Sequence, residues 1–174
     1  MVRLNSRTGE RDLDQLVWGL LPHDTKDPSN APRPIMARAE TVATRPLFAS
    51  AFRNRHAIVP MSVYYQRRAT GGPREWFAIF RRDGEPMAVA GLRESFTWPD
   101  GRITRTYCII TTVANALVAP INGRMPVVLE QEDWPVWLGE QPGDPESLLR
   151  PPSADILQYR PSAEGRTKRQ RDLF

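Results

Sequence analysis

Proline constrains the fold of this chain more than any other residue type. Seventeen of the 174 residues are proline, which is about twice the usual share, and they are scattered rather than clustered. Because proline fixes φ and lacks a backbone N–H, it ends helices and interrupts interior strands. The chain is therefore predicted to fold into many short elements rather than long helices or an extended linker.

Most of the short segments have the composition of β-strands. They are rich in Val, Ile, Tyr and Phe, which favour a pleated, half-buried surface. Asp83-Gly84 predicts a tight turn that pairs residues 76–80 with residues 87–92 as a hairpin, and Asp100-Gly101 predicts a second turn. The predicted strands cover residues 16–20, 56–59, 63–66, 76–80, 87–92, 104–112 and 125–129, with Pro60 between the second and the third.

Two segments have helical patterns instead. Pro46 suits a first helical position, and Phe48 and Phe52 follow it four residues apart on one face. Residues 131–149 also show helical spacing of large apolar side chains, and Asp144 has the character of an N-cap within that segment.

Many strands and few helices predict an α+β fold. We expect a curved, mostly antiparallel sheet, closed in part into a barrel, with short helices packed around it. The length suffices for one domain, which we expect over residues 1–160. Residues 161–174 are expected to form a basic, flexible tail, because apolar side chains are scarce there until the last two residues.

Charge is distributed unevenly along the chain. Residues 1–125 carry 18 basic and 11 acidic side chains, a net charge of +7, whereas residues 126–159 carry one basic and seven acidic, a net charge of −6. A positive body beside an acidic segment suits a polyanion held on one face. A general preference for arginine explains the basic residues equally well, since 22 of the 24 are Arg.

Several functional classes are disfavoured by what the chain lacks. No apolar run reaches the roughly 18 residues of a membrane span, and the first residues lack a secretory signal, so we expect a cytoplasmic protein without a membrane partner. A single cysteine, Cys108, and two separated histidines, His23 and His56, argue against a disulfide and a zinc site. Common phosphate-loop and nucleophile-elbow motifs are absent, so these motifs predict neither an enzyme nor a cofactor.

A series of short segments in the same order resembles one protein family. These segments are Trp18-Gly19-Leu20-Leu21-Pro22, Met36–Thr41, Pro60–Arg67, Ala90-Gly91-Leu92, Ile110-Thr111-Thr112 and Asn122–Pro126. They resemble the SOS response-associated peptidases, or abasic-site processing proteins, over about residues 3–160. The resemblance implies a compact α+β domain around a barrel-like sheet. It also implies a cysteine, exposed at the N-terminus, that condenses with the aldehyde of an abasic site in single-stranded DNA to form a thiazolidine. The same apparatus is implied to cleave the family's own N-terminal peptide.

The reactive positions that the resemblance implies are substituted in this chain. Val2 stands in place of the cysteine, Met36 of an asparagine, Gln66 of a glutamate and Asn122 of a histidine. Met36 is a poor partner for a sugar oxygen, and neither Gln66 nor Asn122 titrates near neutral pH. Cys108 offers no replacement, because its nitrogen is a chain amide. We therefore expect the covalent and peptidase chemistry to be lost, which leaves no catalytic residue and no metal or cofactor site.

The segment before Trp18 has 17 residues, whereas the family generally has some tens of residues before this strand. A misplaced or truncated start would account for Val2. It would not account for Met36, Gln66 and Asn122, which favour a true loss of the chemistry.

Two arginines match family positions that reach DNA phosphates. Arg38 and Arg124 have the planar, bidentate donor geometry that suits phosphate oxygens, so single-stranded or abasic DNA is the expected partner. A structural alternative for Arg38 is an ion pair with Glu40. An interaction or scaffold protein is the alternative function, because aromatic residues expected after Pro22 and at Arg67 are missing.

The C-terminus contains a second motif. Gln170, Asp172, Leu173 and Phe174 resemble the peptide by which bacterial repair proteins bind the replication sliding clamp. Burying Leu173 and Phe174 in a partner's pocket would contribute about 1.5–3 kcal/mol each. Alternatively, the two side chains fold back onto the protein's own sheet.

Overall fold

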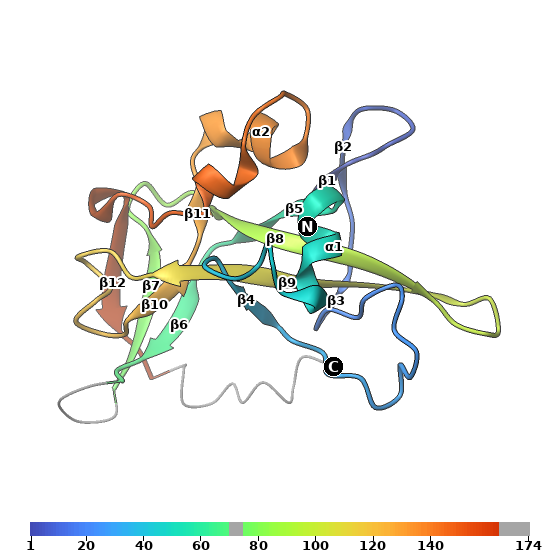
Figure 1. Cartoon of the computed structure of the whole chain (residues 1–174). Coiled ribbons are helices and arrows are strands. Elements are labelled where there is room, and N and C mark those ends of the chain that lie inside the picture. The colour runs from blue at the N-terminus through green and yellow to red at the C-terminus, as the bar shows by residue number, and fades with distance from the viewer. Residues whose placement is uncertain (70–74, 164–174) are drawn as a thin grey trace.

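The computed structural model describes residues 1–69 and 75–163, and their strands form two sheets. The larger sheet has the order β10-β9-β8-β5-β1-β2, with β3 and β4 paired to β9 and β11 paired to β8. The smaller sheet has the order β12-β7-β6. Together they form a curled, mostly antiparallel half-barrel with few helices (Figure 1), which confirms the predicted α+β class.

The element bounds are as follows. The larger sheet contains β1 (Val2–Leu4), β2 (Arg11–Leu13), β3 (Val17–Trp18), β4 (Met36–Arg38), β5 (His56–Met61), β8 (Met87–Thr97), β9 (Ile103–Val113), β10 (Arg124–Pro126) and β11 (Val128–Leu129). The smaller sheet contains β6 (Tyr64–Arg67), β7 (Trp76–Arg81) and β12 (Leu157–Pro161). The helices are α1 (Pro46–Asn54) and α2 (Trp134–Leu138), with 3-10 turns η1 (Gln131–Asp133), η2 (Pro145–Leu148) and η3 (Ala154–Ile156).

The long β8–β9 hairpin forms the centre of the larger sheet. Its turn is the predicted one: Gly101 adopts a φ of +82°, which favours glycine, and the Trp98 N–H donates to the Arg102 carbonyl at 2.8 Å. The predicted strand at residues 104–112 is confirmed as β9.

The hairpin predicted around Asp83-Gly84 is wrong. A turn does form, with Gly84 at a φ of +83°. However, β7 pairs with β6 and β12, whereas β8 pairs with β5 and β9. Because both edges of β7 are already paired, the turn carries the chain from one sheet to the other.

Two further strand predictions need correction. Residues 125–129 form two strands, because the chain passes at Val127 from pairing with β9 to pairing with β8. Pro60 lies inside β5 and does not end it. The Ala90 N–H donates to the Val127 carbonyl and so points away from β5, which makes Ile58–Ala90 a non-hydrogen-bonded pair of the β5–β8 ladder. Such pairs recur every two residues, so Pro60 and its partner Ala88 are another. The nitrogen of Pro60 therefore faces away from β8, and its missing N–H removes no hydrogen bond from this ladder.

The helix predicted from Pro46 is confirmed as α1, with Phe48 and Phe52 buried on one face. The helical segment expected over residues 131–149 is shorter, because α2 spans only Trp134–Leu138 and Gly139 ends it. Asp144 caps η2 as expected, since its side chain accepts a hydrogen bond from the Glu146 N–H at 2.9 Å.

Two hydrophobic cores lie on opposite faces of the larger sheet. The first lies under α1 and α2 and contains Phe52, Leu92 and Trp137, whose Nε1 donates to the Ala57 carbonyl at 2.9 Å. The second contains Ile79 and Ile109 and lies between the two sheets. The second core therefore covers one end of the concave face of the larger sheet.

The predicted clamp-binding residues, Gln170, Asp172, Leu173 and Phe174, lie outside the described residues, as does most of the predicted tail. Within residues 1–69 and 75–163, no helix has the length and apolar character needed to cross a membrane.

Candidate nucleic-acid interface

Both β3 and β4 pair with the same edge of β9, in parallel. Trp18 is opposite Tyr107, Met36 is opposite Ile109, and Arg38 is opposite Thr111. Because alternate residues of a strand share a face, and so do directly opposed residues, these side chains form one stripe. We call this stripe the β9 face, and it comprises Trp18, Met36, Arg38, Arg105, Tyr107, Ile109 and Thr111. Ile109 and Thr111 are buried, and Ile109 belongs to the second core, so the other five side chains form the accessible part.

An aromatic pair lies in the middle of the β9 face. The rings of Trp18 and Tyr107 are stacked, with centroids 6.3 Å apart and an interplanar angle of 10°. The Nε1 of Trp18 donates to the Ile35 carbonyl at 2.9 Å, which fixes the indole. Both side chains are partly exposed, and partial burial raises the pKa of Tyr107. Such a surface is suited to stacking against a nucleic-acid base.

Arg124 is bound to the fold at the end of the β9 face. Its Nη1 and Nη2 donate to Oε1 and Oε2 of Glu40 at 2.5 and 3.0 Å, and Nη2 also donates to the Thr111 carbonyl at 2.7 Å. The hydrogen bond from Arg124 holds the pKa of Glu40 below its ordinary value. The ion pair with Glu40 that was the structural alternative for Arg38 is therefore formed by Arg124.

The side chain of Arg38 lies beside this pair and forms no hydrogen bond or ion pair among residues 1–69 and 75–163. Its side chain is exposed at the end of β4, and its charge contributes to the lowered pKa of Glu40. Met36, two residues earlier on the same face, is 51% exposed. Arg38 is therefore available to an external anion.

The other predicted positions are placed in different surroundings. The Oδ1 of Asn122 accepts a hydrogen bond from the Arg124 N–H at 3.0 Å, so Asn122 shapes the turn before β10. Gln66 lies in β6, opposite Phe77 in the smaller sheet. A hydrogen bond from the Ala69 N–H to the Ile121 carbonyl at 2.9 Å joins the end of that strand to the turn.

Val2 and Cys108 are core positions. Val2 lies in β1, which is separated from β9 in the sheet by β5 and β8, and it packs against the first core. Cys108 is fully buried, and burial raises the pKa of its thiol to about 12. In the described part of the chain, no group of three His, Cys, Asp or Glu side chains could hold a metal ion.

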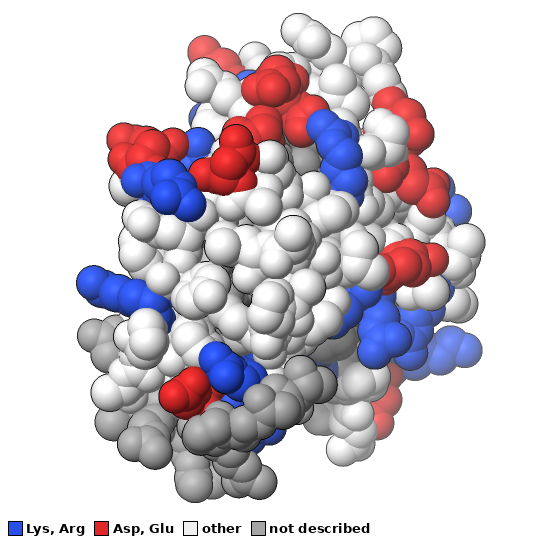
Figure 2. Space-filling view, turned by 90° about the vertical axis from the view of Figure 1, so that its left-hand side faces the viewer, with Lys and Arg blue, Asp and Glu red and all other residues white. Residues whose placement is uncertain are grey.

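Charge is distributed unevenly over one side of the molecule. Figure 2 shows a neutral centre on this side, with many of the acidic side chains toward the top, where basic side chains also lie, and further basic side chains toward the left, right and lower edges.

Comparison with known proteins identifies the class. Residues 1–164 match the family described as SOS response associated peptidase (SRAP). The abasic site processing protein YoqW of Bacillus subtilis is 35% identical over 150 residues, which cover 84% of this chain and 67% of that protein. YedK of Escherichia coli, also named an abasic site processing protein, is 28% identical over 79% of this chain and 60% of its own length. The chain belongs to the SRAP family.

Solved structures agree with this assignment. A protein from Bacteroides thetaiotaomicron has a TM-score of 0.79 and 28% identity, covering 87% of this chain and 70% of its own. A protein from Bordetella bronchiseptica has a TM-score of 0.73 and 25% identity, covering 83% and 74%. The chain spans about two thirds of the length of the Bacillus relatives it matches.

Proposed function

We propose that this protein binds single-stranded DNA at abasic sites through its β9 face, without forming a covalent bond. Membership of the SRAP family, with relatives named abasic site processing proteins, supports a DNA damage-related function. The observation that carries the proposal is Arg38, an exposed and unpaired guanidinium on the same face as a stacked aromatic pair, four residues along β9 from Tyr107.

Each part of the β9 face has a role in this interaction. The planar fork of Arg38 donates two parallel hydrogen bonds to a phosphate. Trp18 and Tyr107 offer a platform for a neighbouring base, and such stacking is worth about 1–3 kcal/mol per base. Met36 supplies apolar contact where an abasic site lacks its base. Arg124 contributes less, because Glu40 already occupies its fork.

The residues present argue for non-covalent binding. Capture of an aldehyde as a thiazolidine needs an amine and a thiol on adjacent carbons, and the thiol of Cys108 is buried with its nitrogen in a peptide bond. Proton transfer needs a group that titrates near neutral pH, which Met36, Gln66 and Asn122 do not provide. We therefore infer that the protein recognises and binds abasic DNA without catalysing a reaction on it.

Fluorescence anisotropy with a single-stranded abasic oligonucleotide tests the proposal. Arg38→Met is compared with Arg102→Met, which removes an equal charge at the tip of the β8–β9 hairpin, where Arg102 lies over Trp98 at 4.8 Å. Arg38→Met should weaken binding and reduce the slope of log K against log salt by about 0.7, the value of one phosphate contact on a single strand. Equal effects of both variants, or no salt-dependent binding at all, would overturn it.

The alternative, an interaction protein that docks on the sliding clamp through residues 170–174, stays a prediction, because those residues lie outside the described part of the chain.

A further inference from the structure

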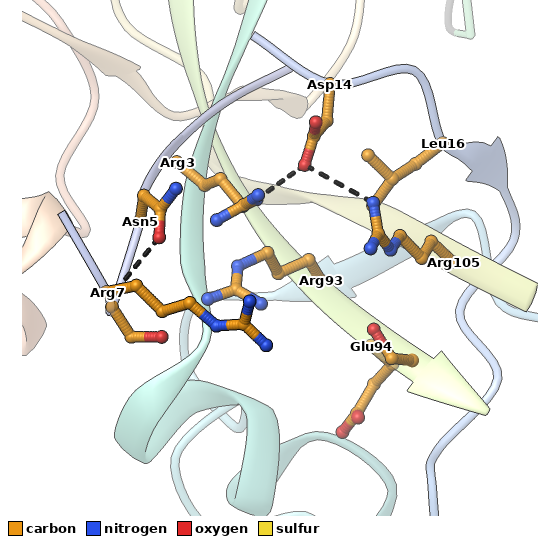
Figure 3. Close-up of a pocket in the computed structure, with 10 residues that line it drawn as sticks. Arg3, Asn5, Arg7, Asp14, Leu16, Arg93, Glu94 and Arg105 are labelled. Carbon is orange, nitrogen blue, oxygen red and sulfur yellow. Dashed lines mark hydrogen bonds and ion pairs between the residues drawn. The ribbon is translucent and has the colours of Figure 1, made fainter. Parts of the chain in front are cut away.

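A polar pocket of about 320 Å³ lies at the far end of β8 and β9 from Arg38. It is enclosed by the β1–β2 segment on one side and by β8 and β9 on the other (Figure 3). We call it the Arg93 pocket, and four arginines line it: Arg3, Arg7, Arg93 and Arg105.

Arg93 is the distinctive residue of this pocket. Its side chain is half-buried on β8, opposite Tyr107, and its Nε is buried without a hydrogen-bond partner. It forms no ion pair with any described residue. Burial lowers the pKa of Arg93, the charges of Arg3 and Arg55 lower it further, and the charges of Asp14 and Glu94 act in the opposite direction. A half-buried cation without a direct ion pair is costly to maintain, so the pocket favours an added anion.

The acidic groups nearby are occupied by other arginines. Asp14 accepts from Nε of Arg3 at 2.5 Å and lies 4.0 Å from Nη1 of Arg105. Asp12 accepts from Nη2 of Arg3 at 3.0 Å. The lining itself holds four guanidinium groups and two carboxylates, those of Asp14 and Glu94, and so carries a net charge of +2.

Glu94 also lines the pocket, but it forms no ion pair with Arg93, its neighbour in β8. Its side chain is 1% exposed and is bound at Oε1 by Nη2 of Arg55 at 2.9 Å. Figure 3 shows its carboxylate directed away from the guanidinium groups of Arg93 and Arg7. Alternation along β8 accounts for this, because adjacent side chains lie on opposite faces of the sheet.

We propose that the Arg93 pocket binds a phosphate group, either as free phosphate or as part of a nucleic-acid backbone. Arginine forks are matched to phosphate oxygens in geometry and charge. Ser6 and Ser95, which are exposed at the pocket, offer hydroxyl donors to the remaining oxygens. The volume is sufficient for a phosphate group and for bridging water.

The proposal that this pocket binds a phosphate of the nucleic-acid backbone rests on the proposed function. Arg105 lies on the β9 face six residues before Thr111, the partner of Arg38. At about 3.3 Å per strand residue, the two cationic sites are roughly 20 Å apart. A strand bound at Arg38 and extended over Trp18 and Tyr107 would reach the Arg93 pocket with a later phosphate.

Thermal unfolding with inorganic phosphate, at constant ionic strength, tests the site without DNA. For a dissociation constant of about 1 mM, 10 mM phosphate should raise the Tm of the unaltered protein by about 3–6 °C. Arg93→Met should abolish the shift, and its Tm without phosphate should be no lower than that of the unaltered protein, since an unpaired charge is removed. Arg105→Met, at a more exposed position, should reduce the shift, whereas Arg102→Met, outside the pocket, should preserve it.

Anisotropy with a single-stranded oligonucleotide then separates the two sources of phosphate. Weaker DNA binding by Arg93→Met, together with loss of the phosphate shift, assigns the pocket to the DNA backbone. Unchanged DNA binding with loss of the shift assigns it to a free phosphate compound. An equal phosphate shift in Arg93→Met, or none in the unaltered protein, would overturn the site. Because the phosphate shift is measured without DNA, whereas Arg38→Met is tested by anisotropy with DNA, failure of the pocket is distinguishable from failure of the β9 face.

Discussion

We expect Glu40 to compete with DNA for Arg124, so replacing Glu40 should separate stability from binding. Glu40→Gln removes the carboxylate that accepts two hydrogen bonds from Arg124, at 2.5 and 3.0 Å. The side chains of Arg124 and Glu40 are 33% and 47% exposed, so the pair belongs to the exposed class worth up to about 1 kcal/mol. For a chain of this length that loss lowers the Tm by about 2–4 °C.

The same substitution should strengthen DNA binding. Removal of a negative charge about 6 Å from a phosphate is worth about 0.7 kcal/mol in water. Release of the Arg124 fork should add a similar amount, giving roughly tenfold tighter binding in total. Anisotropy at low salt measures the affinity, and Glu132→Gln, which removes an equal charge from the exposed side of η1, is the control. If Glu40→Gln binds DNA no more tightly than the unaltered protein, the reasoning is refuted.

The pH dependence of this variant provides a check on the cause. The hydrogen bond from Arg124 holds the pKa of Glu40 below its ordinary value of 4.5. The pair therefore contributes fully above about pH 4.5 and is lost as the pH falls through the lowered pKa. The stability difference between the unaltered protein and Glu40→Gln should be constant near neutral pH and disappear in acid.

Three further predictions concern other parts of the chain. Burial lowers the pKa of His56 to about 4, so the folded protein holds the neutral imidazole, whereas the unfolded chain takes up a proton below about pH 6.5. The free energy of unfolding should therefore fall by up to about 3 kcal/mol between pH 6.5 and 4. Urea titrations should show a smaller fall for His56→Phe. Cys108 should resist iodoacetamide in the folded protein and react once urea unfolds it, because its thiol is buried with a pKa of about 12; rapid alkylation in buffer would contradict this burial. Deletion of residues 170–174 should abolish binding to the purified sliding clamp, and equal binding by both proteins would exclude the motif.

Local signals identified individual elements well but not their partners. Pro46, Phe48 and Phe52 indicate a helix within about two turns, and Asp100-Gly101 joins two strands that are adjacent in sequence. Asp83-Gly84 is an equally strong turn signal, yet the strands beside it belong to different sheets. Which strand occupies an edge is decided by distant segments such as β12, and a local pattern carries no information about them.

The same limit applies to the candidate site. Ordered motifs located Arg38, Arg124 and Asn122 in sequence, but the ion pair from Arg124 to Glu40 joins residues 84 positions apart. The stacking of Trp18 on Tyr107 depends on the register of β3 on β9. In principle, strand alternation could have placed Tyr107 and Arg105 on one face. The parallel pairing of a two-residue strand has no sequence signature.

The absence of a partner for Arg93 was also inaccessible to sequence reasoning. Glu94 is adjacent in the chain, yet alternation along β8 directs it to Arg55 on the other face of the sheet. Only the pairing of β1 with β2 shows that Asp12 and Asp14 are already bound to Arg3.

The central claim is recognition of abasic DNA without covalent capture, and one paired measurement tests it directly. The 174-residue chain is incubated with a labelled single-stranded oligonucleotide containing one abasic site, and each sample is divided between a native and a denaturing gel. We predict a retarded band on the native gel and only unbound oligonucleotide on the denaturing gel. A protein–DNA band that survives denaturation, or no retarded band on the native gel, would contradict the account.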